Sequence, residues 1–142
     1  MTFLLDTDAL SASRRPHLQA IEYQDFLRAF DVGTAYISTV SIMEIEFGIE
    51  RERGRNPDFA NDLTDWLTTV VIPEFTDRIL SFDRRAASIA GRLPTPHKKP
   101  TADAMIAATA LANDLVIVTR NLSDFQPLGV ACLNPWHKPV GR

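Results

Sequence analysis

Short apolar runs that alternate with segments of helical period constrain the fold of this chain more than any other feature. Five runs are rich in large apolar or β-branched residues, namely TFLLDT (2–7), AYIST (35–39), ILSF (79–82), LVIVT (115–119) and VACLNP (130–135). Apolar residues follow one another in most of these runs, as is typical of strands buried on both faces of a parallel sheet. The segments between them have helical patterns. The sequence therefore predicts a doubly wound α/β fold.

The helical segments are expected at about 16–30, 40–53, 63–71, 84–93 and 101–114. Pro16 is suited to open the first of these helices and Gly33 to end it. The stretch RERGRNPDFAND (51–62) is interpreted as a polar break, and PTPHKKPT (94–101) as a loop. No repeat or linker divides the chain, so we expect residues 1–142 to form one domain.

Composition excludes several classes of protein. The single cysteine, Cys132, cannot form an intramolecular disulfide. The apolar stretches are roughly half the length of about 20 residues that a membrane-spanning helix needs. The N-terminus lacks the pattern of an export signal. We therefore expect a cytoplasmic protein without a membrane segment. The net charge of -3 does not decide whether the chain binds nucleic acid.

Polar residues follow two of the predicted strands. Asp6 and Asp8 come directly after the first apolar run, and the fourth run is followed by Thr119, Arg120, Asn121 and Asp124. Ligands of open parallel sheets bind outside the carboxyl ends of the strands, so both groups are expected at one edge. The alternative is that Asp6 and Asp8 only start a turn, with Asp8 capping the next helix.

Glu44 lies in a helix that is expected to be covered on most sides. Val40, Met43 and Phe47 fall near Glu44 on the helical wheel, and isoleucines form a second apolar face. A carboxylate in such surroundings is costly unless another group pairs with it. A capping box from Ser41 to Glu44 is the structural alternative, and the sequence leaves both open.

Asp103 opens the helix of residues 101–114, which is apolar around almost its whole circumference. Thr101 is expected to cap this helix, and the helix dipole favours an acid in the first turn. A bound cation would explain Asp6, Glu44 and Asp103 together, because carboxylates gathered in a cleft repel one another. Oxygen ligands without histidine or cysteine favour Mg²⁺ or Mn²⁺ over zinc. The pattern predicts metal-dependent phosphoester chemistry.

Five motifs carry a resemblance to a known family: LLDTDAL, SIMEIEFGI, TADAMIAATA, IVTRNLSDF and the late NPW. In order and spacing they resemble PIN-domain ribonucleases, and more closely VapC-type toxins of the FitB-like branch. The resemblance implies a three-layer α/β/α fold with a mostly parallel five-stranded sheet. It also implies that Asp6, Glu44 and Asp103 hold one or two Mg²⁺ or Mn²⁺ ions. The implied partners are an RNA substrate, a VapB-like antitoxin and a second copy in a homodimer.

The chain departs from the family pattern at the fourth acid. Asn121 stands where close relatives have aspartate, so the resemblance places Asn121 with the catalytic residues, and Thr119 fits the hydroxyl that supports the site. Asp124 is the alternative fourth acid, but we expect it to cap the turn before Phe125, which we expect in the core. Basic residues near predicted loops and helix ends are candidates for holding RNA: Arg14, Arg15, Arg51, Arg53, Arg55, Arg84, Arg85, His97, Lys98, Lys99 and Arg120.

Two other functions remain open at this stage. Asp6-Thr7-Asp8 also resembles the opening motif of haloacid-dehalogenase-type phosphatases, and Lys99 to Asp103 resembles a later motif of that family. Against this reading, Ala9 replaces the usual glycine and Glu44 has no role. The second alternative is a binding module of PIN-like fold, in which Asn121 marks a catalytically weakened site.

Overall fold

The computed structural model describes residues 2–96 and 98–137, and it contains a five-stranded sheet in the order β3-β2-β1-β4-β5. The strands are β1 (Phe3–Leu5), β2 (Ala35–Ser38), β3 (Ile79–Leu80), β4 (Val116–Val118) and β5 (Cys132–Leu133). Every pairing is parallel. Each of the five apolar runs therefore forms a strand, as the sequence predicted.

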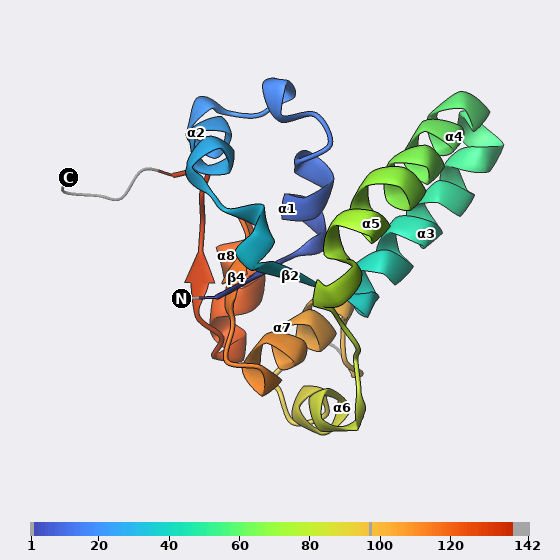
Figure 1. Cartoon of the computed structure of the whole chain (residues 1–142). Coiled ribbons are helices and arrows are strands. Elements are labelled where there is room, and N and C mark those ends of the chain that lie inside the picture. The colour runs from blue at the N-terminus through green and yellow to red at the C-terminus, as the bar shows by residue number, and fades with distance from the viewer. Residues whose placement is uncertain (1, 97, 138–142) are drawn as a thin grey trace.

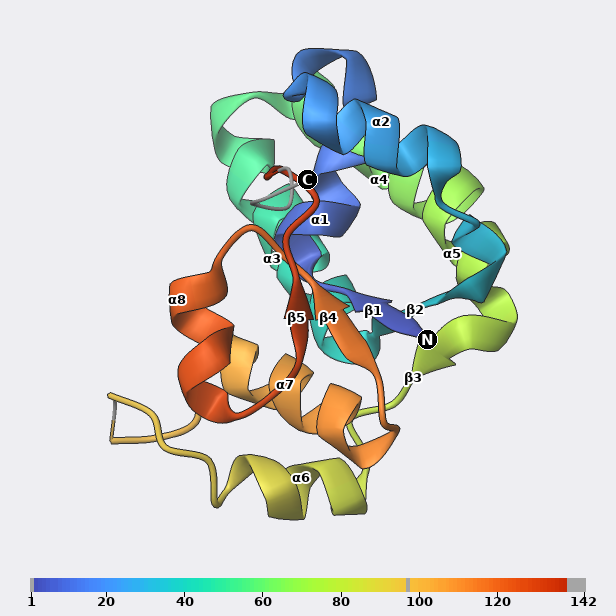
Figure 2. The ribbon, with the colours of Figure 1, turned by 90° about the vertical axis from the view of Figure 1, so that its left-hand side faces the viewer.

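Helices cover both faces of the sheet (Figures 1 and 2). The helices packed on one side are α1 (Thr7–Ala12), α2 (Ile21–Ala29), α3 (Thr39–Arg55), α4 (Pro57–Trp66) and α5 (Ile72–Phe75). The opposite layer consists of α6 (Arg84–Ala90), α7 (Ala102–Ala112) and α8 (Leu122–Phe125). Neighbouring strand residues point to different cores: Leu5 and Val118 enter the first, whereas Leu4 and Ile117 enter the second. This arrangement confirms the three-layer α/β/α fold.

The predicted helix over residues 16–30 is broken. A short 3₁₀ turn covers Pro16–Leu18, and α2 begins only at Ile21, because Gln19 has an extended backbone and Ala20 is not helical. As a result, Leu18 and Ile21 are 65% and 54% exposed instead of packing on one buried side. The helix ends at Ala29, and Gly33 lies in a separate 3₁₀ turn.

The predicted polar break over residues 51–62 is also wrong. Helix α3 continues to Arg55, and only Asn56 separates it from α4. The Asn56 side chain accepts a hydrogen bond from the Phe59 amide, and Pro57 is the first residue of α4. Asparagine at a cap followed by proline starts a helix efficiently, so the polar residues here face solvent on two helices.

The α3 helix is less covered than its sequence pattern indicates. Met43 is 54% exposed and Phe47 is 69% exposed, although Ile45 and Ile49 are buried in the first core. Figure 1 shows that α3, α4 and α5 project together beyond the sheet, so part of α3 has no strand beside it.

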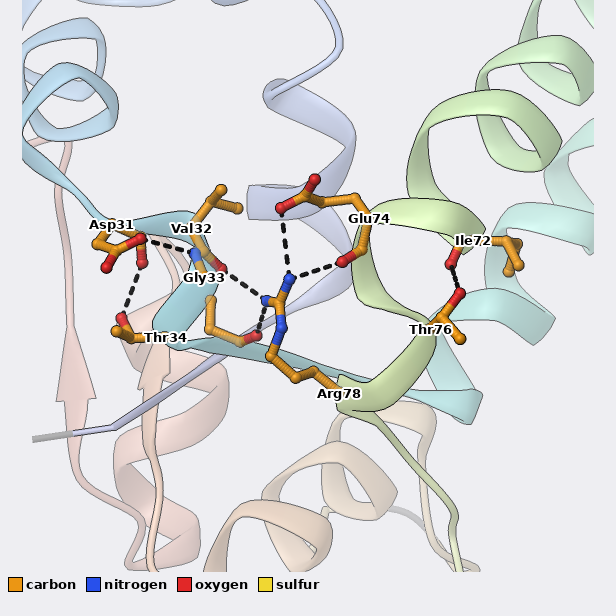
Figure 3. A network of polar contacts seen from close by, with 9 residues as sticks. Asp31, Val32, Gly33, Thr34, Ile72, Glu74, Thr76 and Arg78 are labelled. Atoms are coloured by element: carbon orange, nitrogen blue, oxygen red, sulfur yellow. Dashed lines mark hydrogen bonds and ion pairs between the residues drawn. The ribbon is translucent and has the colours of Figure 1, made fainter.

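Arg78 joins the far end of this helical layer to the sheet (Figure 3). Its guanidinium donates to the carbonyl oxygens of Val32, Ala35 and Glu74 at 2.6, 2.5 and 2.6 Å. The cation also lies over the Phe75 ring, 4.9 Å from its centroid. These contacts hold the entry to β2 against the end of α5, on the side of the sheet away from the carboxyl ends of the strands. Among the described residues, no helix has the length and apolar character needed to cross a membrane.

Candidate active site

Asp6 lies where β1 ends and α1 begins. Its amide donates to the Val118 carbonyl at 3.1 Å, which extends the β1–β4 pairing by one step. One carboxylate oxygen accepts from the Ala9 amide at 2.7 Å, and the other accepts from the Thr119 hydroxyl at 2.6 Å. Asp6 is therefore the cap of α1, and the expectation that Asp8 caps this helix is wrong. The two bonds fix both oxygens of Asp6 at the sheet edge.

Burial dominates the electrostatics of Asp6. The residue is 3% exposed, and desolvation raises the pKa of its carboxyl group to about 6. The bonds from Thr119 and Ala9 act in the opposite direction, and the charges of Asp8 and Asp103 add to the rise. A carboxylate with these surroundings gains from a nearby cation, because the cation lowers the cost of its charge.

Glu44 comes from α3 and contacts Thr7, the residue after Asp6. Its carboxylate accepts from the Thr7 hydroxyl at 2.6 Å, and the Thr7 oxygen lies 2.8 Å from the Ser41 hydroxyl oxygen. The cap of α3 is Ser38, whose hydroxyl accepts from the Val40 amide, so the capping box of Ser41 and Glu44 does not form. Thr7 follows Asp6 directly. The start of α1 therefore contains one predicted metal ligand, Asp6, and binds a second, Glu44, through the Thr7 hydroxyl.

Asp103 comes from the first turn of α7. Thr101 caps this helix and accepts from the Ala104 amide at 3.1 Å, as predicted. Burial raises the pKa of Asp103, and the charges of Asp124 and Glu44 raise it further. Because Asp103 also raises the pKa of Asp6, its carboxylate interacts with acids from three other elements. The charge of Asp103 thus acts on Asp6, and the charge of Glu44 acts on Asp103.

Of the residues after β4, Thr119 contacts Asp6 as a supporting hydroxyl would, whereas Asn121 and Asp124 differ from expectation. Thr119 is fully buried; besides donating to Asp6, it accepts from the Asn121 amide at 2.9 Å. Asn121 occupies the cap position of α8 without a side-chain cap bond, and its side chain is exposed. Asp124 lies within α8, so its expected capping role is wrong. Asp103 and Asp124 line the same cavity, which makes Asp124 a second candidate for the fourth acid.

A second cluster surrounds the rim of the site. Arg120 donates to both carboxylate oxygens of Asp8, at 2.7 and 3.1 Å, and lies over the ring of Trp136. The Trp136 ring stacks on Tyr23 with centroids 4.1 Å apart, and the Tyr23 hydroxyl donates to the Ala9 carbonyl. The late NPW motif therefore packs against the elements that hold Asp6. Arg120, which the sequence offered as an RNA contact, is engaged in this cluster.

Other predicted residues have varied surroundings. Phe125 is fully buried in the second core, as expected. Arg53 and Arg55 form ion pairs with neighbouring glutamates of α3, and Arg14 lies over the Phe59 ring. His97 lies outside the described residues. The sequence analysis did not predict that the Thr7 hydroxyl binds Glu44. The signal was a hydroxyl residue directly after the acid at the end of β1.

The donor set fits a hard divalent cation, but it is not a closed metal cage. Asp6, Glu44 and Asp103 offer only oxygen atoms, which Mg²⁺ and Mn²⁺ prefer. Within residues 2–96 and 98–137, none of these three carboxylates forms an ion pair with lysine or arginine. Over the same residues, no three acidic, histidine or cysteine side chains lie together as a ready metal cluster. The carboxylates therefore form an uncompensated acidic site whose mutual repulsion a cation would relieve.

Comparisons with known proteins agree with this architecture. A family model described as "PIN domain" matches residues 3–126. Plasmid stability protein StbB of Pseudomonas syringae pv. tomato is 33% identical over 139 residues, with 94% of this chain and 97% of the relative covered. Toxin FitB of Neisseria gonorrhoeae is 33% identical, with 94% and 98% covered. VapC ribonuclease Y4jK of Sinorhizobium fredii is 30% identical, with 94% and 96% covered.

Solved structures show the same similarity. The crystal structure of FitAcB from Neisseria gonorrhoeae matches with a TM-score of 0.82 and 31% identity, covering 96% of this chain and 100% of that one. A structure of FitAB bound to an IR36 DNA fragment matches with a TM-score of 0.83 and 29% identity, covering 99% and 100%. The family match decides against the haloacid-dehalogenase-like alternative. The fold, the family model and the full-length similarity together show that this chain belongs to the PIN-domain family.

Proposed function

We propose that this chain is a metal-dependent ribonuclease and the toxin of a toxin–antitoxin pair. The proposal is supported by three carboxylates, Asp6, Glu44 and Asp103, which come from three different elements and have no cationic partner among the described residues. The names of two relatives, toxin FitB and VapC ribonuclease Y4jK, support the toxin and ribonuclease roles.

In the proposed site, Asp6, Glu44 and Asp103 hold Mg²⁺ or Mn²⁺. Such an ion polarises a phosphate ester and lowers the pKa of a bound water, which supplies a nucleophile near neutral pH. The protein's contribution is orientation: Ala9 and Thr119 fix the Asp6 carboxylate, and Thr7 fixes the Glu44 carboxylate. Without a cation, the same negative charges would repel the phosphates of RNA.

The activity test uses the purified protein with a fluorescent single-stranded RNA in MnCl₂ and in EDTA. We expect cleavage in MnCl₂ only, and its loss in Asp103→Asn and Glu44→Gln. The matched control is Glu46→Gln, two residues along α3, because Glu46 is exposed to solvent. A folded Asp103→Asn variant that cuts RNA at the parent rate would refute the assignment. A parent that neither binds Mn²⁺ by calorimetry nor cuts RNA would favour the weakened binding module.

The proposed protein partner is an antitoxin. Solved structures similar to this chain include FitAcB, FitAB bound to DNA and VapBC2 bound to DNA. An unregulated ribonuclease would also harm the cell that makes it. The acidic site suits a basic side chain of the inhibitor, which would neutralise the carboxylates in place of the metal. Co-expression with the small protein encoded next to this chain should give a stable complex without ribonuclease activity. A complex as active as the free chain would contradict direct inhibition.

The proposed assembly is a homodimer, as the family resemblance implies. Exposed Met43 and Phe47 on α3 are compatible with a contact to a second copy, because large apolar side chains at an interface are removed from water. Light scattering should give the mass of a dimer, and Phe47→Ser should shift the mass toward the monomer. A parent with the mass of a monomer at all concentrations would contradict the proposal.

A further inference from the structure

A cavity beside the acidic site has no role in the function proposed so far. It lies between the loop that precedes α7 and helix α8, and its volume is about 330 Å³. Asp103 and Asp124 form one part of its lining, so the cavity opens directly next to a predicted metal ligand. This volume is at the small end of the roughly 300–1,000 Å³ of ligand sites, which suits one nucleotide-sized group.

The walls of the cavity are chemically mixed. Pro94 and Pro96 come from the loop, and Pro127 comes from the turn after α8. Proline rings are flat, rigid and apolar, and they lose little conformational freedom when a ligand packs on them. Ser123 adds a hydroxyl that has no hydrogen-bond partner among the described residues. Apolar walls with a few polar groups are what a planar heterocycle with polar edges requires.

Charge is arranged unevenly around the cavity. Lys98 and Lys99 line two further hollows, which share Thr101 or the Pro94–Thr95 stretch with this cavity. The carboxylates of Asp103 and Asp124 line the cavity itself. If the scissile phosphate of an RNA strand lies at a metal held by Asp103, a neighbouring phosphate of the same strand would lie near the lysines. The base between those phosphates would lie over the proline-walled cavity.

We propose that the cavity between the Pro94–Pro96 loop and α8 is a subsite for one unpaired base of the RNA, next to the scissile phosphate; this rests on the proposed function. Single-stranded RNA is read through bases that are splayed out of the stack, packed on side chains and hydrogen-bonded at their edges. The Ser123 hydroxyl supplies a hydrogen-bond donor and an acceptor for the edge of such a base. The subsite therefore influences which position of an RNA is cut.

The decisive variant is Ser123→Leu, which fills the cavity from an exposed position of α8. Its matched control is Ser88→Leu, because Ser88 is also exposed but lies on α6 and does not line the cavity. Both proteins and the parent are given a single-stranded RNA with one preferred cut site, in MnCl₂. The same RNA is then made with an abasic nucleotide at each position that flanks the cut.

We expect one flanking position at which the abasic nucleotide slows cleavage by the parent about tenfold, in keeping with the loss of one base contact. Ser123→Leu should cut intact RNA as slowly as the parent cuts that abasic RNA. The cleavage rate of Ser123→Leu should be the same on intact and abasic RNA. Ser88→Leu should behave as the parent does. The subsite is refuted if no flanking abasic position matters, or if Ser123→Leu keeps the parent's sensitivity to it.

A second measurement needs neither metal nor cleavage. Neutral nucleosides titrated in EDTA into ¹⁵N-labelled parent should shift the amide signals of Ser123 and Asp124, and should shift none of them in Ser123→Leu. The proposal requires this result as well, and nucleosides without effect on the cavity signals overturn it. If the parent protein cuts no RNA in MnCl₂, the proposed function itself is refuted. If the parent cuts RNA at a rate that no abasic position changes, only the subsite is refuted.

Discussion

Asp6→Asn should stabilise the metal-free protein at neutral pH. Asp6 is 3% exposed, and burial raises the pKa of its carboxyl group to about 6 from an ordinary value of 3.8. The folded protein therefore holds this proton more tightly than the unfolded chain does. A difference of about two pH units means that ionised Asp6 costs about 3 kcal/mol of stability above pH 7. Asparagine removes the charge and is as good a helix cap as aspartate.

The sign of the pH dependence follows from the same shift. Below about pH 4 the carboxyl group is protonated in both states, so it costs nothing. Between about pH 4 and pH 6 the unfolded chain ionises first, so the free energy of unfolding of the parent falls as the pH rises. We expect Asp6→Asn to be more stable than the parent by about 2–3 kcal/mol at pH 7.5 and by less than about 1 kcal/mol at pH 4.

Urea unfolding in EDTA, followed by circular dichroism at both pH values, measures this difference. Asp65→Asn is the matched control, because Asp65 lies on the exposed side of α4, and it should change stability by less than about 0.5 kcal/mol. If Asp6→Asn were no more stable than the parent at pH 7.5, burial of an uncompensated charge would be the wrong account of Asp6. An equal gain at both pH values would also refute the reasoning.

Three further predictions concern the metal and the rim of the site. Saturating MnCl₂ should raise the thermal midpoint of the parent by the linkage of binding to folding, and Asp103→Asn should lose most of that rise in differential scanning fluorimetry. Asn121→Asp should tighten Mn²⁺ binding in calorimetry, because it adds a charge. Asp124→Asn should weaken Mn²⁺ binding, because Asp124 lies beside Asp103. An unchanged Mn²⁺ affinity in Asp124→Asn would exclude Asp124 as a ligand. Trp136→Ala should lower the free energy of unfolding by about 2 kcal/mol in urea, since it removes the stacking on Tyr23 and the contact with Arg120.

Local patterns in the sequence determined most of the secondary structure. Continuous apolar runs marked all five strands, and Thr101 marked the start of α7. These features depend on residues within about one turn of each other, so they can be predicted from the local sequence. The break before α2 was missed because Gln19 and Ala20, the residues after Leu18, carry no strong helix-ending signal. Asn56 with Pro57 was recognised as a break but not as the short junction of two helices.

The positions of the strand-end and helix-start acids were also predictable. Strands in a parallel sheet end at the same edge, so Asp6 and the residues after β4 had to lie close together. What holds each acid there was not predictable from the chain alone. Thr119 bonds Asp6 across 113 residues, and Thr7 bonds Glu44 across 37. Partners so distant in the sequence are selected by the register of β1 on β4 and by the packing of α1 on α3.

The tertiary structure alone decided which acids face one another and which apolar residues stay exposed. Asp124 joins Asp103 because α8 packs against α7, and Phe47 remains exposed because α3 projects past the sheet. The helical wheel could not distinguish these cases, since a periodic pattern states which side of a helix is apolar but not what lies beside it. The local sequence therefore determined where most strands and helices form and which residues supply carboxylates at their ends. Packing, which depends on contacts between distant residues, determined how those acids are oriented and which surface is left open.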